Sequence, residues 1–254
     1  MNIQLYLDRL NFKSQISVSK EVLFELQAAH LLSIPFENLD IHYNNKIKLD
    51  IASIYKKVVL NRRGGFCYEL NGLFYHLLKN IGFDVKMVSG RVYSKDETYG
   101  AEYDHLAIVA NINGENYLVD VGFGKFSYKP LEILLGINLS DEFGSFRFDK
   151  AYDDYLRINL VDGNGNLVPQ YLFKVNEREF WEFEGMCEFH QTSKESHFTS
   201  KKVISIITKN GRKTLNNTQL KITDGDTESI IEFDEELFEF YLKEHFNIEI
   251  NGNC

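Results

Sequence analysis

The sequence has few of the residues that mark several protein classes. Its 254 residues include only three prolines and three cysteines, which argues against proline-rich linkers and against a disulfide framework. The cysteines, Cys67, Cys187 and Cys254, stand far apart, so a zinc site of the CxxC type is not expected and we predict no metal. An odd number of widely spaced thiols fits a reducing compartment.

Long apolar runs and an excess of positive charge are also missing. No segment has the unbroken apolar length that spans a bilayer, and the first residues lack the basic and apolar regions of a secretory signal. The formal net charge is −9 without a dense block of Lys and Arg, so neither nucleic acid nor an anionic membrane is an expected partner. We therefore expect a cytoplasmic protein, whose 44% of apolar residues suffice for a core.

The first part of the chain has the spacing of amphipathic helices. Apolar residues recur at helical intervals over residues 22–29, 51–60 and 67–81. Pro35 interrupts this pattern because it has no N–H donor and biases the preceding residue towards extended geometry. The sequence thus predicts a helical N-terminal region with a connector over residues 33–40.

Beyond about residue 82 the pattern changes. Residues 83–189 alternate between polar and β-branched or aromatic residues, with turn signals between them, which predicts a curved sheet or barrel. The last part mixes predicted strands, at residues 202–208 and 248–250, with a predicted helix over 234–246. The fold class we expect is α+β in three parts that pack together, with divisions at residues 1–82, 83–190 and 191–254.

One cysteine stands where a reactive thiol would be built. Cys67 follows Gly64 and Gly65 and begins the predicted helix, so the helix dipole would favour its thiolate. The two glycines permit a tight turn and would let a substrate approach the sulfur. Taken alone, a small buried hydrophobe is the simpler interpretation of this cysteine, so its partners must decide.

Those partners are predicted by a hairpin. Asn113 and Gly114 form the strongest short hairpin signal, and a two-residue turn there would pair Ile112 with Glu115. Continuing this register makes His105 and Asp120 diagonal neighbours on one face of the sheet. A core histidine or a strand-end aspartate would explain either residue alone. Together with the helix-start cysteine they favour a Cys67-His105-Asp120 relay, in which His105 takes the thiol proton and Asp120 orients the imidazole.

The chain resembles the arylamine N-acetyltransferases of bacteria. The resemblance rests on IPFENL at residues 34–39, RGGFCYELN at 63–71, DHL at 104–106, YLVDVGFG at 117–124 and TSKESHF at 192–198. It implies an N-terminal helical bundle, a central β-barrel and a C-terminal α/β lid around a papain-like catalytic core. It also implies that Cys67, His105 and Asp120 form the triad, and that Cys67 passes an acetyl group from acetyl-CoA to an aromatic amine or hydrazine by ping-pong chemistry.

The resemblance also implies roles outside the triad. Phe36, Phe123 and Phe198 match an aromatic acceptor pocket, although core packing would explain them too. Arg9, Glu37 and Arg63 resemble a charge cluster that braces the bundle, while His190 in place of an expected asparagine and Lys194 in place of a common proline are departures from the family pattern.

The coenzyme site is predicted from the residues themselves. The glycine turn after Asp120 offers backbone N–H groups, such as that of Gly124, and the ammonium of Lys125 to the coenzyme pyrophosphate. A solvated lysine in a glycine turn explains Lys125 equally well.

Two other functions remain open from the sequence. A cysteine hydrolase or a transglutaminase-like enzyme would use the same order of Cys, His and Asp. A non-catalytic scaffold could keep the fold without the reaction, although an intact trio of residues argues against it.

Overall fold

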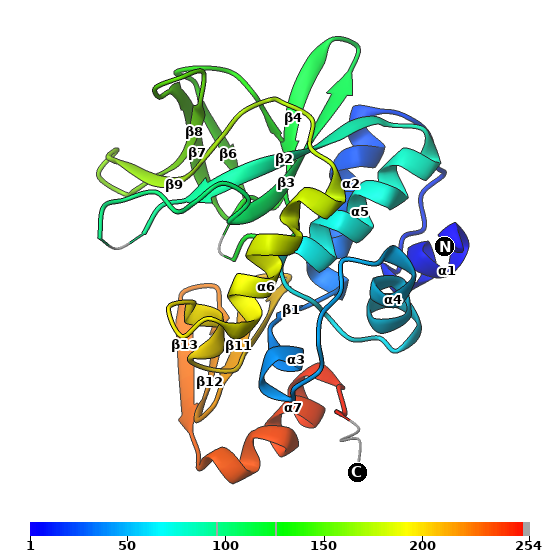
Figure 1. Ribbon diagram of the computed structural model, residues 1–254, viewed down its shortest axis with the longest axis vertical. Coiled ribbons are helices and arrows are strands. Elements are labelled where there is room, and N and C mark those ends of the chain that lie inside the picture. The colour runs from blue at the N-terminus through cyan, green and yellow to red at the C-terminus, as the bar shows by residue number, and fades with distance from the viewer. Residues whose placement is uncertain (95, 125, 251–254) are drawn as a thin grey trace.

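The computed structural model describes residues 1–94, 96–124 and 126–250 (Figure 1). Helices of the N-terminal part lie against one side of a large curved sheet, and a smaller sheet with the C-terminal helix lies at the other end of the molecule. The predicted mixed fold of helices and a barrel-like sheet is confirmed. The exact three-part division stays a prediction.

The helices before residue 82 follow the predicted apolar spacing. Their bounds are Ile3–Arg9 (α1), Lys20–Ser33 (α2), Leu39–His42 (α3), Ile51–Tyr55 (α4, continued by a π-helical turn, Lys56–Leu60) and Cys67–Ile81 (α5). Side-chain oxygens of Asn2, Ser19 and Asp50 accept backbone N–H groups at the starts of α1, α2 and α4, which satisfies donors that a helix cannot pair internally.

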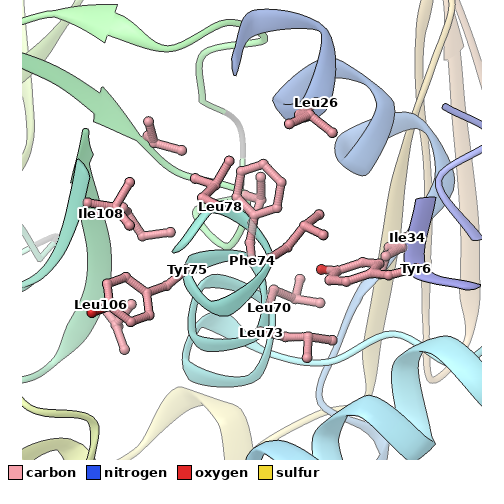
Figure 2. Close-up of a cluster of buried hydrophobic side chains, with 14 of the residues drawn as sticks. Tyr6, Leu26, Ile34, Leu70, Leu73, Phe74, Tyr75, Leu78, Leu106 and Ile108 are labelled. Carbon is pink, nitrogen blue, oxygen red and sulfur yellow. The ribbon is translucent and has the colours of Figure 1, made fainter. Parts of the chain in front are cut away.

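Helix α5 is the centre of the core. Figure 2 shows its Leu70, Phe74 and Leu78 among apolar side chains from α1, α2 and the large sheet, including Leu26 and Ile108. Apolar contacts on nearly every side bury this helix and fix its axis. The start of α5, and therefore Cys67, is placed by the best-packed part of the molecule.

The large sheet has eight antiparallel strands in the order β5-β4-β3-β2-β9-β8-β7-β6. Their bounds are Asp84–Val92 (β2), His105–Ile112 (β3), Glu115–Val119 (β4), Leu131–Glu132 (β5), Asn138–Asp141 (β6), Gly144–Lys150 (β7), Leu156–Val161 (β8) and Leu167–Phe173 (β9). Helix α5 packs against β2 and β3 on one face. Leu106, Ile108 and Ala110 of β3 pack against this helix, whereas His105, the first residue of the strand, has the parity of Ala107 and Val109 on the other face.

The smaller sheet has five antiparallel strands in the order β1-β10-β11-β12-β13. Their bounds are Phe36–Glu37 (β1), Val203–Thr208 (β10), Gly211–Asn216 (β11), Gln219–Asp224 (β12) and Thr227–Glu232 (β13). The predicted connector around Pro35 thus contributes an edge strand to a sheet formed otherwise by the end of the chain. This pairing bridges about 165 residues of sequence, which local periodicity cannot reveal.

Two predictions about elements were wrong, and one group of strands was missed. The segment before residue 190, expected in the barrel, is helical: Phe180–Phe183 is a 3-10 turn and Glu184–Thr192 is α6. Residues 248–250 form no strand, because the chain turns at Asn247, whose φ is 53°, and packs Ile248 on the small sheet instead. Strands β11 to β13 were not predicted, since their many polar residues hide the alternation. The predicted C-terminal helix is present as the turn Glu235–Leu237 followed by Phe238–Phe246 (α7).

Two negative findings apply to the described parts of the chain. Within them, no helix combines the length and the apolar character needed to cross a bilayer. The same residues include no group of three or more His, Cys, Asp or Glu side chains placed to hold a metal ion.

Candidate active site

Cys67 is the first residue of α5, as the sequence predicts. The helix start is capped by Glu69, whose Oε2 accepts the backbone N–H of Phe66 at 3.1 Å. The same carboxylate lies 2.9 Å from the ammonium of Lys57, so the residue that caps the helix is itself held. The ion pair of Glu69 and Lys57 therefore fixes the backbone at the start of α5, from which the side chain of Cys67 projects.

A charge cluster surrounds the cap. Arg63 donates from Nε and Nη2 to the two carboxylate oxygens of Glu37 at 2.8 and 2.9 Å, and from Nη2 to Asp40 at 2.9 Å. Lys57 lies 2.7 Å from Asp40 and so joins Arg63 and Glu69 into one network. Burial raises the pKa of Asp40, but the two cations outweigh it and leave that pKa below its usual value.

Arg9 works differently from the prediction. Its guanidinium donates to backbone carbonyls, of which Ser33 at 2.6 Å and Val58 at 3.2 Å are the nearest, rather than to a carboxylate.

Gly64 lets the turn before Cys67 pack against the chain at Pro35, because a Cβ on Gly64 would collide with the carbonyl oxygen of Pro35. These contacts tie the turn before Cys67 to the end of α2, so the glycine serves packing as well as turn geometry.

The predicted hairpin and its register are correct. Asn113 and Gly114 both have positive φ, 54° and 91°, and Ile112 pairs with Glu115. The imidazole Nε2 of His105 lies 2.7 Å from Oδ2 of Asp120, and both side chains are buried. A carboxylate only accepts hydrogen bonds, so Nε2 carries the proton and Nδ1 keeps the lone pair that can accept one.

Asp120 accepts four hydrogen bonds. His105 and the hydroxyl of Tyr171, at 3.0 Å, donate to Oδ2, while the backbone N–H of Gly122 and Nδ2 of Asn71, both at 2.9 Å, donate to Oδ1. A buried carboxylate without such partners would cost several kcal/mol. The four bonds therefore fix the orientation of Asp120 and, through it, that of the imidazole.

Asn71 connects the helix of Cys67 to the hairpin. It lies one helical turn after Cys67, donates to Asp120 and to the carbonyl of Leu106 at 2.6 Å, and accepts the N–H of Val121 at 2.9 Å. Asn71 ends the RGGFCYELN motif, and no role was predicted for it from the sequence. Its spacing of four from the cysteine was the signal that could have revealed it.

Gly122 lets the two elements meet. A Cβ at this position would lie 2.8 Å from Cα of Cys67 and 2.8 Å from Nδ2 of Asn71, which is closer than real side chains come. The start of α5 thus rests directly on the loop that follows Asp120. Cys67 thus lies close to the loop that follows Asp120, and Asp120 in turn holds His105.

The helix dipole was expected to favour the thiolate of Cys67 and so to lower its pKa, but the pKa is raised. Burial raises the pKa of Cys67 well above its ordinary value, and the carboxylates of Asp104 and Asp120 act in the same direction. The dipole of α5 acts in the opposite direction at this terminus, and the loss of solvent outweighs it. The resting side chain is a thiol that needs a base to react.

The three predicted pocket phenylalanines are all partly buried and lie around this centre. The ring of Phe123 lies 5.1 Å from that of His105, between centroids, and Phe36 and Phe198 lie 6.1 Å apart. Phe36 and Phe123 line one narrow cleft together with Gly122 and Gly124. The cleft has a volume of about 20 Å³, so an aromatic amine can enter only if one of these rings turns.

Of the two residues predicted to bind the coenzyme, the structure describes only Gly124. Gly124 lines the cleft, and its carbonyl oxygen accepts a hydrogen bond from Nη2 of Arg212 at 2.8 Å. Lys125 lies outside the described residues. Arg212, on β11, was not singled out in the sequence because nothing local marks it.

His190, the unexpected residue of α6, lies beside the pocket. Its ring meets that of Phe198 edge-on at 5.2 Å between centroids. Its Nδ1 lies 3.1 Å from Oγ of Ser196, and its Nε2 lies 3.1 Å from a carboxylate oxygen of Asp104, the neighbour of His105 in the chain. A second imidazole with a carboxylate partner thus borders the proposed acceptor pocket.

Comparisons with known proteins agree with this geometry. A family model described as N-acetyltransferase matches residues 20–254. Human arylamine N-acetyltransferase 1 is 32% identical over 276 residues, a match that includes 98% of this chain and 95% of the human protein. The chain belongs to the arylamine N-acetyltransferase family. Members of this family are acyltransferases, so the chain is assigned to that class of enzyme.

Two solved arylamine N-acetyltransferases superpose on nearly the whole chain. The enzyme of Mycobacterium smegmatis has a TM-score of 0.88 at 28% identity, over 98% of this chain and 93% of its own. The enzyme of Bacillus cereus has a TM-score of 0.91 at 25% identity, over 98% of this chain and 100% of its own, and is described as having a unique Cys-His-Glu triad. In this chain the residue that meets the histidine is the aspartate Asp120.

Proposed function

We propose that the chain transfers an acetyl group from acetyl-CoA to the nitrogen of an arylamine, arylhydrazine or hydrazide through an acetyl-Cys67 intermediate. The observation that carries this proposal is the fixed orientation of His105 by Asp120, with the start of α5 clamped to the same carboxylate by Asn71. An imidazole with a free Nδ1 beside a helix-start thiol is the arrangement that nucleophilic acyl transfer requires.

In the first half-reaction His105 accepts the thiol proton at Nδ1 while the sulfur of Cys67 attacks the carbonyl carbon of the thioester. Burial raises the pKa of the Cys67 thiol, which is why this step calls for a base. The imidazolium is stabilised by Asp120 at 2.7 Å and returns its proton to the departing thiolate of coenzyme A. An acetyl-cysteine and free coenzyme A remain.

In the second half-reaction the amine nitrogen attacks the acetyl-cysteine and His105 removes its proton. The bond between the acetyl carbon and the sulfur of Cys67 breaks, and His105 returns the proton to the departing thiolate, which regenerates the free enzyme. Each tetrahedral oxyanion needs a preorganised donor, and the backbone N–H of Cys67 serves because the first residue of a helix does not pair its N–H internally. Phe36, Phe123 and Phe198 would hold a flat acceptor by contact with its ring. A closed aromatic cleft also keeps water from the thioester, which favours transfer over hydrolysis.

Mass spectrometry of the protein mixed with acetyl-CoA, without acceptor, tests the intermediate directly. We expect one acetyl group on Cys67, none in the Cys67→Ala variant, and unchanged labelling in a Cys187→Ser control, whose buried thiol lies outside the triad. Adding an arylamine should remove the label and yield the acetylated amine. A protein that stays unlabelled under these conditions would contradict the proposal.

The same experiment separates the alternatives. Cleavage of amides or peptides without formation of an acetylated amine would favour a cysteine hydrolase or a transglutaminase-like enzyme. A non-catalytic scaffold would show a rate of alkylation of Cys67 by iodoacetamide that is unaltered by His105→Gln. The proposed enzyme predicts slower alkylation in that variant, because the base that removes the thiol proton is gone.

A further inference from the structure

An unpaired cation borders the proposed active site. Arg212, on β11, is partly buried and reaches the loop after β4, where it donates to Oγ of Ser205 at 3.0 Å and to the carbonyl oxygen of Gly124 at 2.8 Å. Among the described residues no carboxylate lies within ion-pair distance of its guanidinium, whereas Arg63 and Arg157 both have one. Neutral oxygens balance only part of a cation that has lost much of its water.

The position of Arg212 indicates which ligand could neutralise its positive charge. Arg212 lines the narrow cleft of Phe123 and Gly122, and Gly122 is the residue that touches the start of α5 at Cys67. It also lines a second hollow of about 200 Å³ between the two sheets, whose walls include the aromatic rings of Phe126 and Phe143. A guanidinium has five donors, and only two are used here, so donors remain for a ligand in these hollows.

We propose that Arg212 binds the diphosphate of the acyl-CoA donor. A donor lying across both hollows would place its diphosphate at the guanidinium and its base near Phe126 and Phe143. Its thioester arm would enter the narrow cleft, which must widen for the arm as it must for an aromatic amine. Arginine suits this task, because its planar fork meets phosphate oxygens with two parallel hydrogen bonds. The bond to Gly124 would at the same time connect donor binding to the loop that follows Asp120. This inference rests on the proposed acetyl transfer.

Three donors and matched variants test it. S-acetylpantetheine has the same thioester and arm as acetyl-CoA but no phosphate, and acetyl-3′-dephospho-CoA keeps only the diphosphate. Arg212→Gln should raise KM for acetyl-CoA and for the dephospho donor about tenfold to a hundredfold, as expected for lost hydrogen bonds to a charged group. KM for S-acetylpantetheine should change less than about twofold, and Arg212→Lys should restore part of the loss for the two phosphorylated donors.

Lys213→Gln is the control, because it removes the same charge from the next residue of β11, whose side chain points to the other face of the sheet. It should leave all three values of KM unchanged. Equal losses for the donors with and without phosphate would show a structural role for Arg212 and overturn the inference, as would no loss with any donor. A rise in KM for acetyl-CoA alone would also overturn it, because Arg212 would then bind the 3′-phosphate. A rise in KM seen only with a carboxylate-bearing arylamine would overturn it too, because Arg212 would then bind the acceptor.

Calorimetric binding of free coenzyme A distinguishes failure of this inference from failure of the proposed reaction. If wild-type protein forms no acetyl-Cys67 with any donor, the proposed reaction fails, yet weaker coenzyme A binding in Arg212→Gln than in Lys213→Gln would still support the phosphate site. Equal binding by the two variants, or no binding by the wild-type protein, would refute the site.

Discussion

The approach of α5 to the catalytic hairpin depends on the missing side chain of Gly122. A methyl group at this position would lie 2.8 Å from Cα of Cys67 and 2.8 Å from Nδ2 of Asn71. The φ of Gly122 lies outside the positive region, so Gly122→Ala introduces a collision without backbone strain. Ordinary contact begins near 3.4 Å, and the helix start must therefore move by about 0.6 Å or more.

The magnitude of the loss follows from this displacement. Overpacking a buried contact costs about 1–3 kcal/mol of stability, which a chain of this size tolerates. A nucleophile displaced by about 1 Å loses roughly 100-fold in rate. Gly122→Ala should therefore fold while its kcat/KM for acetyl transfer falls about 100-fold, with most of the loss in formation of acetyl-Cys67.

Steady-state transfer to a p-substituted aniline, with urea unfolding on the same samples, measures both effects. Gly163→Ala is the control, since a Cβ there meets nothing within 4 Å and its φ is not positive. It should change neither quantity. A Gly122→Ala variant with kcat/KM within about twofold of the wild type would refute the argument that this contact positions the thiol.

Three further outcomes are expected. Asn71→Ala should lower the rate of Cys67 acetylation at least about tenfold, because it removes the hydrogen bond that joins α5 to Asp120. Asn80→Ala, on the exposed side of the same helix, is the control and should leave the rate unchanged. Equal rates in the two variants would contradict a positioning role for Asn71. Glu37→Gln should cost about 3–5 kcal/mol in urea unfolding, because it leaves Arg63 short of a buried partner, and a loss below about 1 kcal/mol would contradict this. Burial, aided by a nearby arginine, lowers the pKa of His30 to about 3, so the unfolded chain binds more protons below about pH 6.5. Stability should therefore rise with pH between 5 and 6 with a slope of up to about 1.4 kcal/mol per unit, and His30→Gln should flatten that slope; parallel profiles would exclude the explanation.

The catalytic hairpin could be predicted because it is local. Asn113 and Gly114 both adopt positive φ, and this turn type fixes the pairing of the strands on either side. Side chains alternate along a strand, so the register alone sets His105 and Asp120 on one face. The position of Cys67 at a helix start was predictable for the same reason, from the spacing of the apolar residues that follow it.

The contacts that assemble the site could not be predicted in this way. Asn71 and Gly122 meet across about fifty residues of sequence, and Arg212 reaches Gly124 across about ninety. The strand around Phe36 pairs with β10, and the polar strands of the small sheet show too little alternation to be recognised. Such pairings depend on packing of the whole chain rather than on local preference.

The sequence by itself determined which residues carry the chemistry and which of them share a helix turn or a strand face, because periodicity and turn geometry act over a few residues. The tertiary structure decided how near α5 comes to the hairpin, that Asp120 receives four hydrogen bonds, and that burial rather than the helix dipole governs the thiol of Cys67. Solvent exclusion and close packing are properties of the assembled core, so no segment encodes them alone.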